Sequence, residues 1–138
     1  MTMTTEHDTV KVSVLMPVYN AAETLAECVD SILQQTMPDF EVIAVDDFCD
    51  DDSIDILRSY HDERIRIVEN TEKGIVSALN HGLKYCRSDV VARMDADDIM
   101  NQKRLEKQLA AMMDDSVTLC ASQVEKFPQE LIQPGYME

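Results

Sequence analysis

Short apolar runs alternate along the chain with segments whose apolar residues recur every three or four positions. The runs predict buried β-strands, and the periodic segments predict amphipathic helices. Strands are expected at residues 11–16, 40–45, 65–68, 88–92 and 117–121, and helices at residues 25–33, 54–60, 76–86 and 105–112. This alternation predicts right-handed βαβ crossovers, and therefore an α/β fold with a mostly parallel sheet flanked by helices.

Three residues are expected to mark boundaries in this pattern. Pro17 should halt the first strand, because proline cannot donate to a strand ladder. Asn20 is a candidate cap for the helix that follows. Gly74 is expected to open the third helix.

An acidic cluster follows the fourth expected strand, where Asp95, Asp97 and Asp98 lie within four residues. Three carboxylates so close together are hard to keep ionised unless water or a cation neutralises them. Mg²⁺ takes oxygen ligands and is commonly held by one or two carboxylates together with a substrate phosphate. Taken alone, the cluster is explained about equally well by a solvated turn or by a helix N-terminus capped by Asp97 or Asp98.

The carboxyl ends of the expected strands gather the other candidate residues. Residues 17–20, Asp46 with Asp47, and residues 95–98 all follow a strand. Ligands of parallel sheets bind beyond those ends, so the three segments are expected to line one crevice. The further acids Asp50 and Asp51 are interpreted as a solvated loop with a capping aspartate.

Composition limits the classes of partner. The 138 residues suffice for one domain, and 12 basic against 27 acidic side chains give a net charge of −15. Nucleic acid is therefore not expected as a partner, because backbone-phosphate binding needs clustered Lys and Arg. An anionic small substrate would need a metal or a group of amide donors.

Cysteine spacing and hydropathy bear on the compartment. The four cysteines form no Cys-x-x-Cys pair, and reduced cytosolic thiols are the default for such a chain. Residues 1–9 lack the basic start and apolar core of a signal peptide, and no apolar run approaches the length of a membrane span. We therefore expect a cytoplasmic segment.

Several motifs together resemble the nucleotide-sugar-binding half of family 2 glycosyltransferases, which have the Rossmann-like GT-A fold. They are VSVLMPVYN at residues 12–20, SILQQT at 31–36, VDD at 45–47, ALNHGL at 78–83 and ARMDADD at 92–98. The resemblance covers about residues 11–122, as a truncated nucleotide-sugar-binding domain. Residues 1–10 would be a disordered extension, and residues 123–138 a tail leading to a missing acceptor-binding half.

The resemblance implies transfer of a sugar from a nucleotide diphosphate, with a UDP-sugar as the expected donor, to a glycan or lipid-linked acceptor in polysaccharide biosynthesis, with inversion. The acidic cluster would be the family's DXD motif, with Mn²⁺ or Mg²⁺ held by Asp95, Asp97 and Asp98. Asp47 would accept a hydrogen bond from the base, and Asp46 would support its loop. The implied nucleotide-binding residues are Pro17, Val18, Tyr19, Asn20, Asp47, Arg93, Asp95 and Asp97.

Two departures from the family's pattern affect the site. Phe48 stands where the family usually has glycine, and its turn needs positive φ if the geometry is kept. Leu79 stands where arginine is common, and this variant resembles a subgroup that carries Arg93 before the acidic cluster. Arg93 is equally compatible with contact to a phosphate and with an ion pair to Asp95.

The resemblance places the catalytic base in the second half of the domain, so no catalytic residue is assigned. Glu125 and Glu130 are the acids of the tail, and their spacing identifies neither as a base. We expect a segment that binds donor but is inactive alone, with an exposed sheet edge that favours homo-oligomers. The full-length protein would then act in the cytoplasm or at the inner face of the membrane.

Two other classes compete with an enzyme segment. One is a noncatalytic nucleotide-binding or interaction module that keeps the fold with a degraded nucleotide loop. The other is a receiver-like signalling domain, which also holds Mg²⁺ with acids after a strand. The receiver is disfavoured because one acidic pair follows the second strand and the cluster follows the fourth. Metal-dependent UDP binding would distinguish the enzyme segment from the noncatalytic module.

Overall fold

A four-stranded parallel sheet forms the centre of the protein, in a computed structural model that describes residues 10–114 and 116–120. The strand order is β3-β2-β1-β4, which confirms the predicted α/β class with a parallel sheet. The strands are β1 (Val12–Val18), β2 (Phe40–Asp46), β3 (Ile65–Glu69) and β4 (Val91–Arg93).

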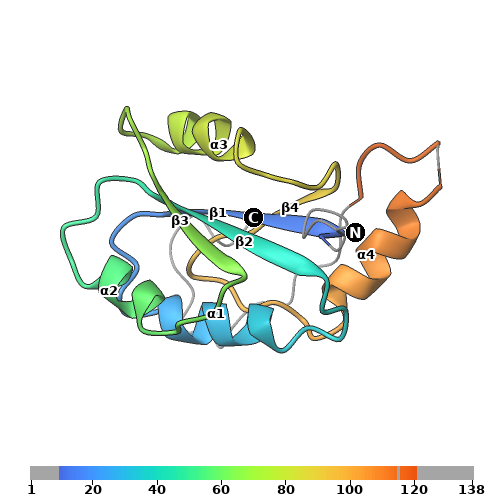
Figure 1. Ribbon diagram of the computed structural model, residues 1–138, viewed down its shortest axis with the longest axis horizontal. Coiled ribbons are helices and arrows are strands. Elements are labelled where there is room, and N and C mark those ends of the chain that lie inside the picture. The colour runs from blue at the N-terminus through green and yellow to red at the C-terminus, as the bar shows by residue number, and fades with distance from the viewer. Residues whose placement is uncertain (1–9, 115, 121–138) are drawn as a thin grey trace, which may run out of the picture.

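Helices cover both faces of the sheet. Figure 1 shows α1 and α2 on one face and α3 on the opposite face, with α4 at the end of the sheet where β1 begins. Their bounds are α1 (Leu25–Leu33), α2 (Ser53–Arg58), α3 (Ile75–Leu83) and α4 (Arg104–Met112). None of the helices in the described ranges is long and apolar enough to cross a bilayer.

The alternation of β1 divides the core into two layers. Val14 and Met16 pack toward α1, whereas Leu15 packs with the side chains that α3 covers. On α1, Val29 and Ile32 are fully buried in the first layer. A central strand buried on both faces is typical of parallel sheets, and it explains why residues 11–16 read as a continuous apolar run.

Pro17 does not end β1, contrary to the sequence-based expectation, because the strand continues to Val18. The N–H of Ser13 points toward β4 and donates to the carbonyl of Val90. Pro17 has the same parity as Ser13, but β4 pairs only as far as Leu15. The missing N–H therefore faces a side where the ladder has already ended, and no hydrogen bond is lost.

Three other boundaries differ from the expected ones. The fourth expected strand, at residues 88–92, is shorter at its start, since β4 begins at Val91. No strand forms at residues 117–120, and residue 121 lies outside the described residues. Asn20 does not cap α1, which begins at Leu25 with Thr24 at the N-cap position. Instead, Asn20 adopts φ 45° and its Oδ1 accepts a hydrogen bond from the N–H of Asp50 at 2.9 Å.

Phe48 adopts φ 61°, so the turn after β2 keeps the left-handed conformation that glycine would supply. This conformation costs a non-glycine residue about 1–2 kcal/mol. We expect Phe48→Gly to raise the free energy of unfolding by about 0.5–1 kcal/mol, since glycine's greater freedom in the unfolded chain offsets part of the gain. Urea denaturation measures the difference.

The matched control is Val76→Gly, at an exposed position in the first turn of α3. It should lower the free energy of unfolding by about 0.5 kcal/mol. A loss of stability in Phe48→Gly comparable with that of the control would show that the turn is not strained.

Candidate functional site

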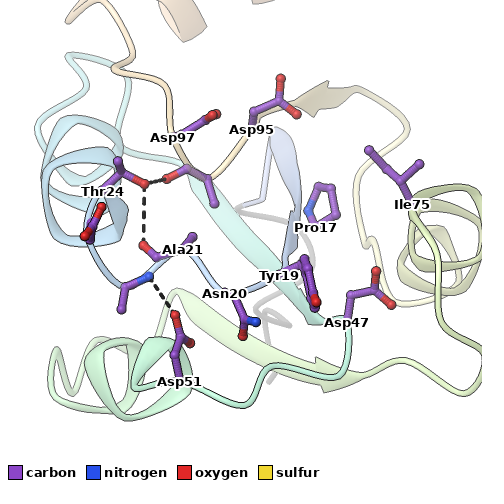
Figure 2. Close-up of a pocket in the computed structure, with 13 residues that line it drawn as sticks. Pro17, Tyr19, Asn20, Ala21, Thr24, Asp47, Asp51, Ile75, Asp95 and Asp97 are labelled. Carbon is purple, nitrogen blue, oxygen red and sulfur yellow. Dashed lines mark hydrogen bonds between the residues drawn. The ribbon is translucent and has the colours of Figure 1, made fainter. Parts of the chain in front are cut away.

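A cavity of about 710 Å³ opens at the carboxyl ends of β1 and β2, beside the loop that follows β4. Its lining brings together residues from all three segments that were expected to meet: Pro17, Tyr19, Asn20, Asp47, Asp95 and Asp97. Figure 2 shows Asp47 at one end of the cavity and the two later aspartates at another.

Three of the expected site residues lie outside this lining. Val18 is fully buried in the core, and only its backbone acts at the site, where its carbonyl accepts the N–H of Asp47 at 2.9 Å. Arg93 is exposed and forms an ion pair with Asp95. Asp98 is not among the lining residues but joins Asp95 and Asp97 in the acidic cluster.

The acidic cluster has the chemistry of a divalent metal site. Asp95, Asp97 and Asp98 can each offer a carboxylate oxygen, and these oxygens lie within 4.8 Å of one another. Burial, together with the charges of Asp95 and Asp97, raises the pKa of Asp98 from 3.8 to about 6. A cation bound among these hard oxygen ligands would relieve that repulsion, so the residues present fit Mg²⁺ or Mn²⁺.

This repulsion predicts that Asp98→Asn stabilises the metal-free protein. The pKa of Asp98 is raised from 3.8 to about 6, so the penalty is absent below pH 3.8 and fully present above pH 6. Since Asp98 is only partly buried, solvent screening reduces the expected gain to about 1 kcal/mol at pH 7. Thermal or urea unfolding at pH 7 and at pH 3.5 measures it, with Asp89→Asn, an exposed acid before β4, as the control. An equal gain at both pH values would contradict the electrostatic cause.

Asp47 is held in place by partners from the segment that follows β3. Its Oδ1 accepts hydrogen bonds from Asn70 Nδ2 at 2.9 Å and from the N–H of Gly74 at 3.0 Å, while Oδ2 has only a longer contact of 3.3 Å with that same N–H. Asp47 and Asn70 are both more than nine-tenths buried. One carboxylate oxygen is thus left to accept a further hydrogen bond from a ligand.

The turn that follows β1 forms another wall of the cavity. Lys73 Nζ lies 4.5 Å from the centroid of the Tyr19 ring and 3.4 Å from its hydroxyl, which sets a cation against the exposed tyrosine. Asp46 Oδ1 accepts the N–H of Cys49 at 2.9 Å, in agreement with its expected support of the loop. Burial raises the pKa of the Cys49 thiol to about 11, so this cysteine is not a reactive thiolate.

Several lining residues were not expected from the sequence. Ile75, at the start of α3, lines the cavity, and about half of the residue's surface is exposed. Asp51 lines the cavity as well as capping its turn: its carboxylate accepts the N–H groups of Ala22 at 3.1 Å and Ser53 at 2.9 Å. The hydrogen bonds from Ser53 hold the pKa of Asp51 below its usual range. Asn70 does not line the cavity but orients Asp47, and the sequence could have identified it, because it directly follows β3 of the same parallel sheet.

The cavity is strongly acidic, which limits what it can bind. Glu23, Asp47, Asp51, Asp95 and Asp97 all contribute to its lining. A diphosphate would be repelled from such a surface unless a cation bridged it to the protein. The cavity therefore suits a ligand with a neutral hydrogen-bonding part near Asp47 and an anionic part that shares a metal with the acidic cluster.

Comparison with known proteins agrees with this geometry. The family model described as Glycosyl transferase family 2 matches residues 13–136. EpsE of Bacillus subtilis (strain 168) is 41% identical over 104 residues, covering 72% of this chain and 37% of that protein. The Escherichia coli protein WfgD, a UDP-Glc:alpha-D-GlcNAc-diphosphoundecaprenol beta-1,3-glucosyltransferase, is 36% identical over 112 residues, covering 78% of this chain and 43% of its own.

Two solved structures share the fold. TarS of S. aureus, in complex with UDP, superimposes with a TM-score of 0.70 at 29% identity, covering 77% of this chain and 32% of that one. The mannosyltransferase PcManGT from Pyrobaculum calidifontis, in complex with GDP-Man and Mn²⁺, gives a TM-score of 0.72 at 29% identity, covering 78% and 33%. The chain thus spans less than half the length of these relatives. Because the family model matches most of its length, the chain belongs to glycosyl transferase family 2.

Proposed function

We propose that this chain is the donor-binding segment of a glycosyltransferase that holds a nucleotide-diphosphate sugar, with UDP as the nucleotide, through Mn²⁺ or Mg²⁺. The observation that carries the proposal is the cavity itself, which has the hydrogen-bonded carboxylate of Asp47 at one end and the Asp95, Asp97 and Asp98 cluster at another. The UDP complex of TarS and the GDP-Man and Mn²⁺ complex of PcManGT support this reading.

Asp47 would bind the base. Its Oδ2 is oriented by the bonds that Asn70 and Gly74 make to the same carboxylate, and it is an acceptor suited to a ring N–H. Uracil offers such a group at N3, whereas the same position of cytosine is itself an acceptor. Pro17 and Ile75 would contact the faces of the ring, since both supply apolar surface to the cavity lining.

The acidic cluster would bind the metal with Asp95, Asp97 and Asp98. When bound, the cation stabilises the negative charge that develops on the departing nucleoside diphosphate. The residues of this chain bind and orient the donor, and they exclude a free diphosphate that lacks the metal. Arg93 pairs with Asp95 and neutralises part of its charge, and its guanidinium would contact a phosphate of the donor when that ion pair opens.

The same proposal includes the acceptor, the stereochemistry of the transfer and the location of the full-length protein. The acceptor would be a glycan or a lipid-linked glycan, the transfer would invert the anomeric centre, and the full-length protein would act in the cytoplasm or at the inner face of the membrane. WfgD acts on a diphosphoundecaprenol-linked acceptor, which supports this acceptor class. Glu125 and Glu130, the acids of the tail, lie outside the described residues, and no residue is assigned as the catalytic base.

The alternative of a noncatalytic module rested on a degraded nucleotide loop. Phe48 nonetheless keeps positive φ, so the backbone that places Asp47 is preserved despite the missing glycine. This favours a working donor site over a degraded one.

Calorimetric titration of the chain with UDP, with and without Mn²⁺, tests the proposal. We expect UDP to bind only when Mn²⁺ is present, and CDP to bind more weakly because N3 of cytosine carries no proton to donate to Asp47 Oδ2. Absence of binding by the folded protein, or binding that is independent of Mn²⁺, would contradict the proposed function.

A further inference from the structure

A stripe of polar side chains runs along α1 and its two ends, beside the apolar face that packs on the sheet. Its members are Thr24, Cys28, Ser31 and Gln35, which follow one another at intervals of four, three and four residues. Residues at these intervals lie on the same side of a helix. All four contact the backbone of the segment between β4 and the start of α4, which includes the acidic cluster.

The first two members contact the backbone between the acids. Thr24 Oγ1 donates to the carbonyl of Ala96 at 3.1 Å, and Figure 2 shows this bond beneath Asp97. Cys28 Sγ donates to the carbonyl of Asp95 at 3.4 Å.

The other two members bind the segment after the acids. Ser31 Oγ accepts the N–H of Met100 at 2.8 Å and donates to a carbonyl within its own helix at 2.6 Å. Gln35 Nε2 donates to the carbonyl of Asn101 at 2.6 Å, and Gln35 Oε1 accepts the N–H of Leu105 at 3.0 Å. Gln35 is more than nine-tenths buried, and its Nε2 also donates to the carbonyl of Ser31 at 3.2 Å, so its amide is held by partners on both segments.

This arrangement answers two demands of the segment. Buried backbone groups that belong to no helix or strand need side-chain partners, and α1 supplies them. The repulsion among Asp95, Asp97 and Asp98 would otherwise favour an open turn with the carboxylates apart. Hydrogen bonds to the backbone within the cluster and just after it resist that opening, and they do so without using the carboxylates themselves.

We propose that Thr24, Cys28, Ser31 and Gln35 are positioning residues that hold the acidic turn in its metal-binding geometry before the cation arrives. The proposal rests on the proposed function, because it concerns the same metal site. Its physical content is preorganisation: the backbone of the turn is ordered during folding, so metal binding does not have to order it.

Two variants test this without changing any of the three aspartates that would bind the metal. Ser31→Ala and Gln35→Met remove hydrogen bonds to the segment, and neither residue lines the cavity or belongs to the acidic cluster. Mn²⁺ is titrated into the full chain by calorimetry, alone and with UDP. We expect both variants to bind Mn²⁺ about tenfold more weakly, at the lower end of the cost of losing outer supports of a metal site.

Two controls separate positioning from stability. Ile32→Val trims the core-facing side of α1 and is expected to lower stability without changing Mn²⁺ affinity by more than twofold. Ser31→Thr keeps a hydroxyl and should restore the affinity that Ser31→Ala loses. Urea denaturation of each variant gives the stability against which the affinities are compared.

The outcomes distinguish this inference from the proposed function. Wild-type binding of Mn²⁺ with both test variants within twofold overturns the positioning role and leaves the proposed function standing. An equal loss of affinity in Ile32→Val also overturns it, because the effect would then follow stability. A wild-type chain that binds no Mn²⁺, alone or with UDP, overturns the proposed metal site and the positioning role together.

Discussion

Asp97→Asn is expected to weaken Mn²⁺-dependent binding of UDP by tenfold or more while the protein stays folded. Asp97 is exposed, and its side chain takes part in no hydrogen bond or ion pair that the structure shows among residues 10–114 and 116–120. Its loss should therefore cost little folding free energy. The carboxylate nevertheless faces the cavity and belongs to the acidic cluster, where asparagine lacks the charge that a divalent cation needs.

The measurement is calorimetric titration with UDP at fixed Mn²⁺, accompanied by thermal unfolding to confirm the fold. Asp89→Asn makes the same change of charge at an exposed position before β4, at the opposite end of the strands. It should leave the affinity within twofold, because charges separated by more than the screening length interact weakly. Isotherms for Asp97→Asn that match the wild type would remove Asp97 from the metal site.

Agreement between sequence and structure is greatest where one rule governs many residues. Alternating strands and helices imply parallel strands, and parallel strands bring their carboxyl ends to one edge. Pro17, Asp47 and Asp95 are far apart in sequence, yet this rule was enough to predict that they line a single cavity. Val18 illustrates the opposite limit, since strand alternation places its side chain with Val14 and Met16 in the core layer that faces α1, and not in the cavity.

Residues that depend on loop conformation were not predictable in the same way. Asp51 reaches the cavity because its turn folds back to bind the N–H of Ala22, across a gap in sequence that no spacing rule covers. Ile75 lines the cavity only because positive φ at Gly74 directs the chain into α3 at that point. The polar stripe on α1 was predictable only in part: its helical spacing can be read from the sequence, but the backbone that it contacts cannot.

Replacement of Gly82 by alanine should have the largest effect on stability. Gly82 lies where α3 packs on the sheet, and a Cβ at this position would come 2.5 Å from Leu15 Cδ1 and 2.7 Å from Val45 Cγ2. Both of these side chains are buried, so neither can move into solvent. Overpacking of this kind costs about 1–3 kcal/mol, while alanine regains up to about 1 kcal/mol of helix propensity. We therefore expect the free energy of unfolding to fall by about 1–2 kcal/mol.

Urea denaturation measures this loss, and Asn80→Ala, at an exposed position of the same helix, is the matched control that should leave stability unchanged or slightly raised. The effect should extend to the site, because α3 begins at Ile75 and the N–H of Gly74 bonds to Asp47. A helix pushed away from β1 and β2 would loosen that bond, so Gly82→Ala should also weaken UDP binding, whereas Asn80→Ala should not. Unchanged stability with unchanged affinity would mean that Leu15 and Val45 repack without moving α3, and that the close approach of this helix is not what holds Asp47 in place.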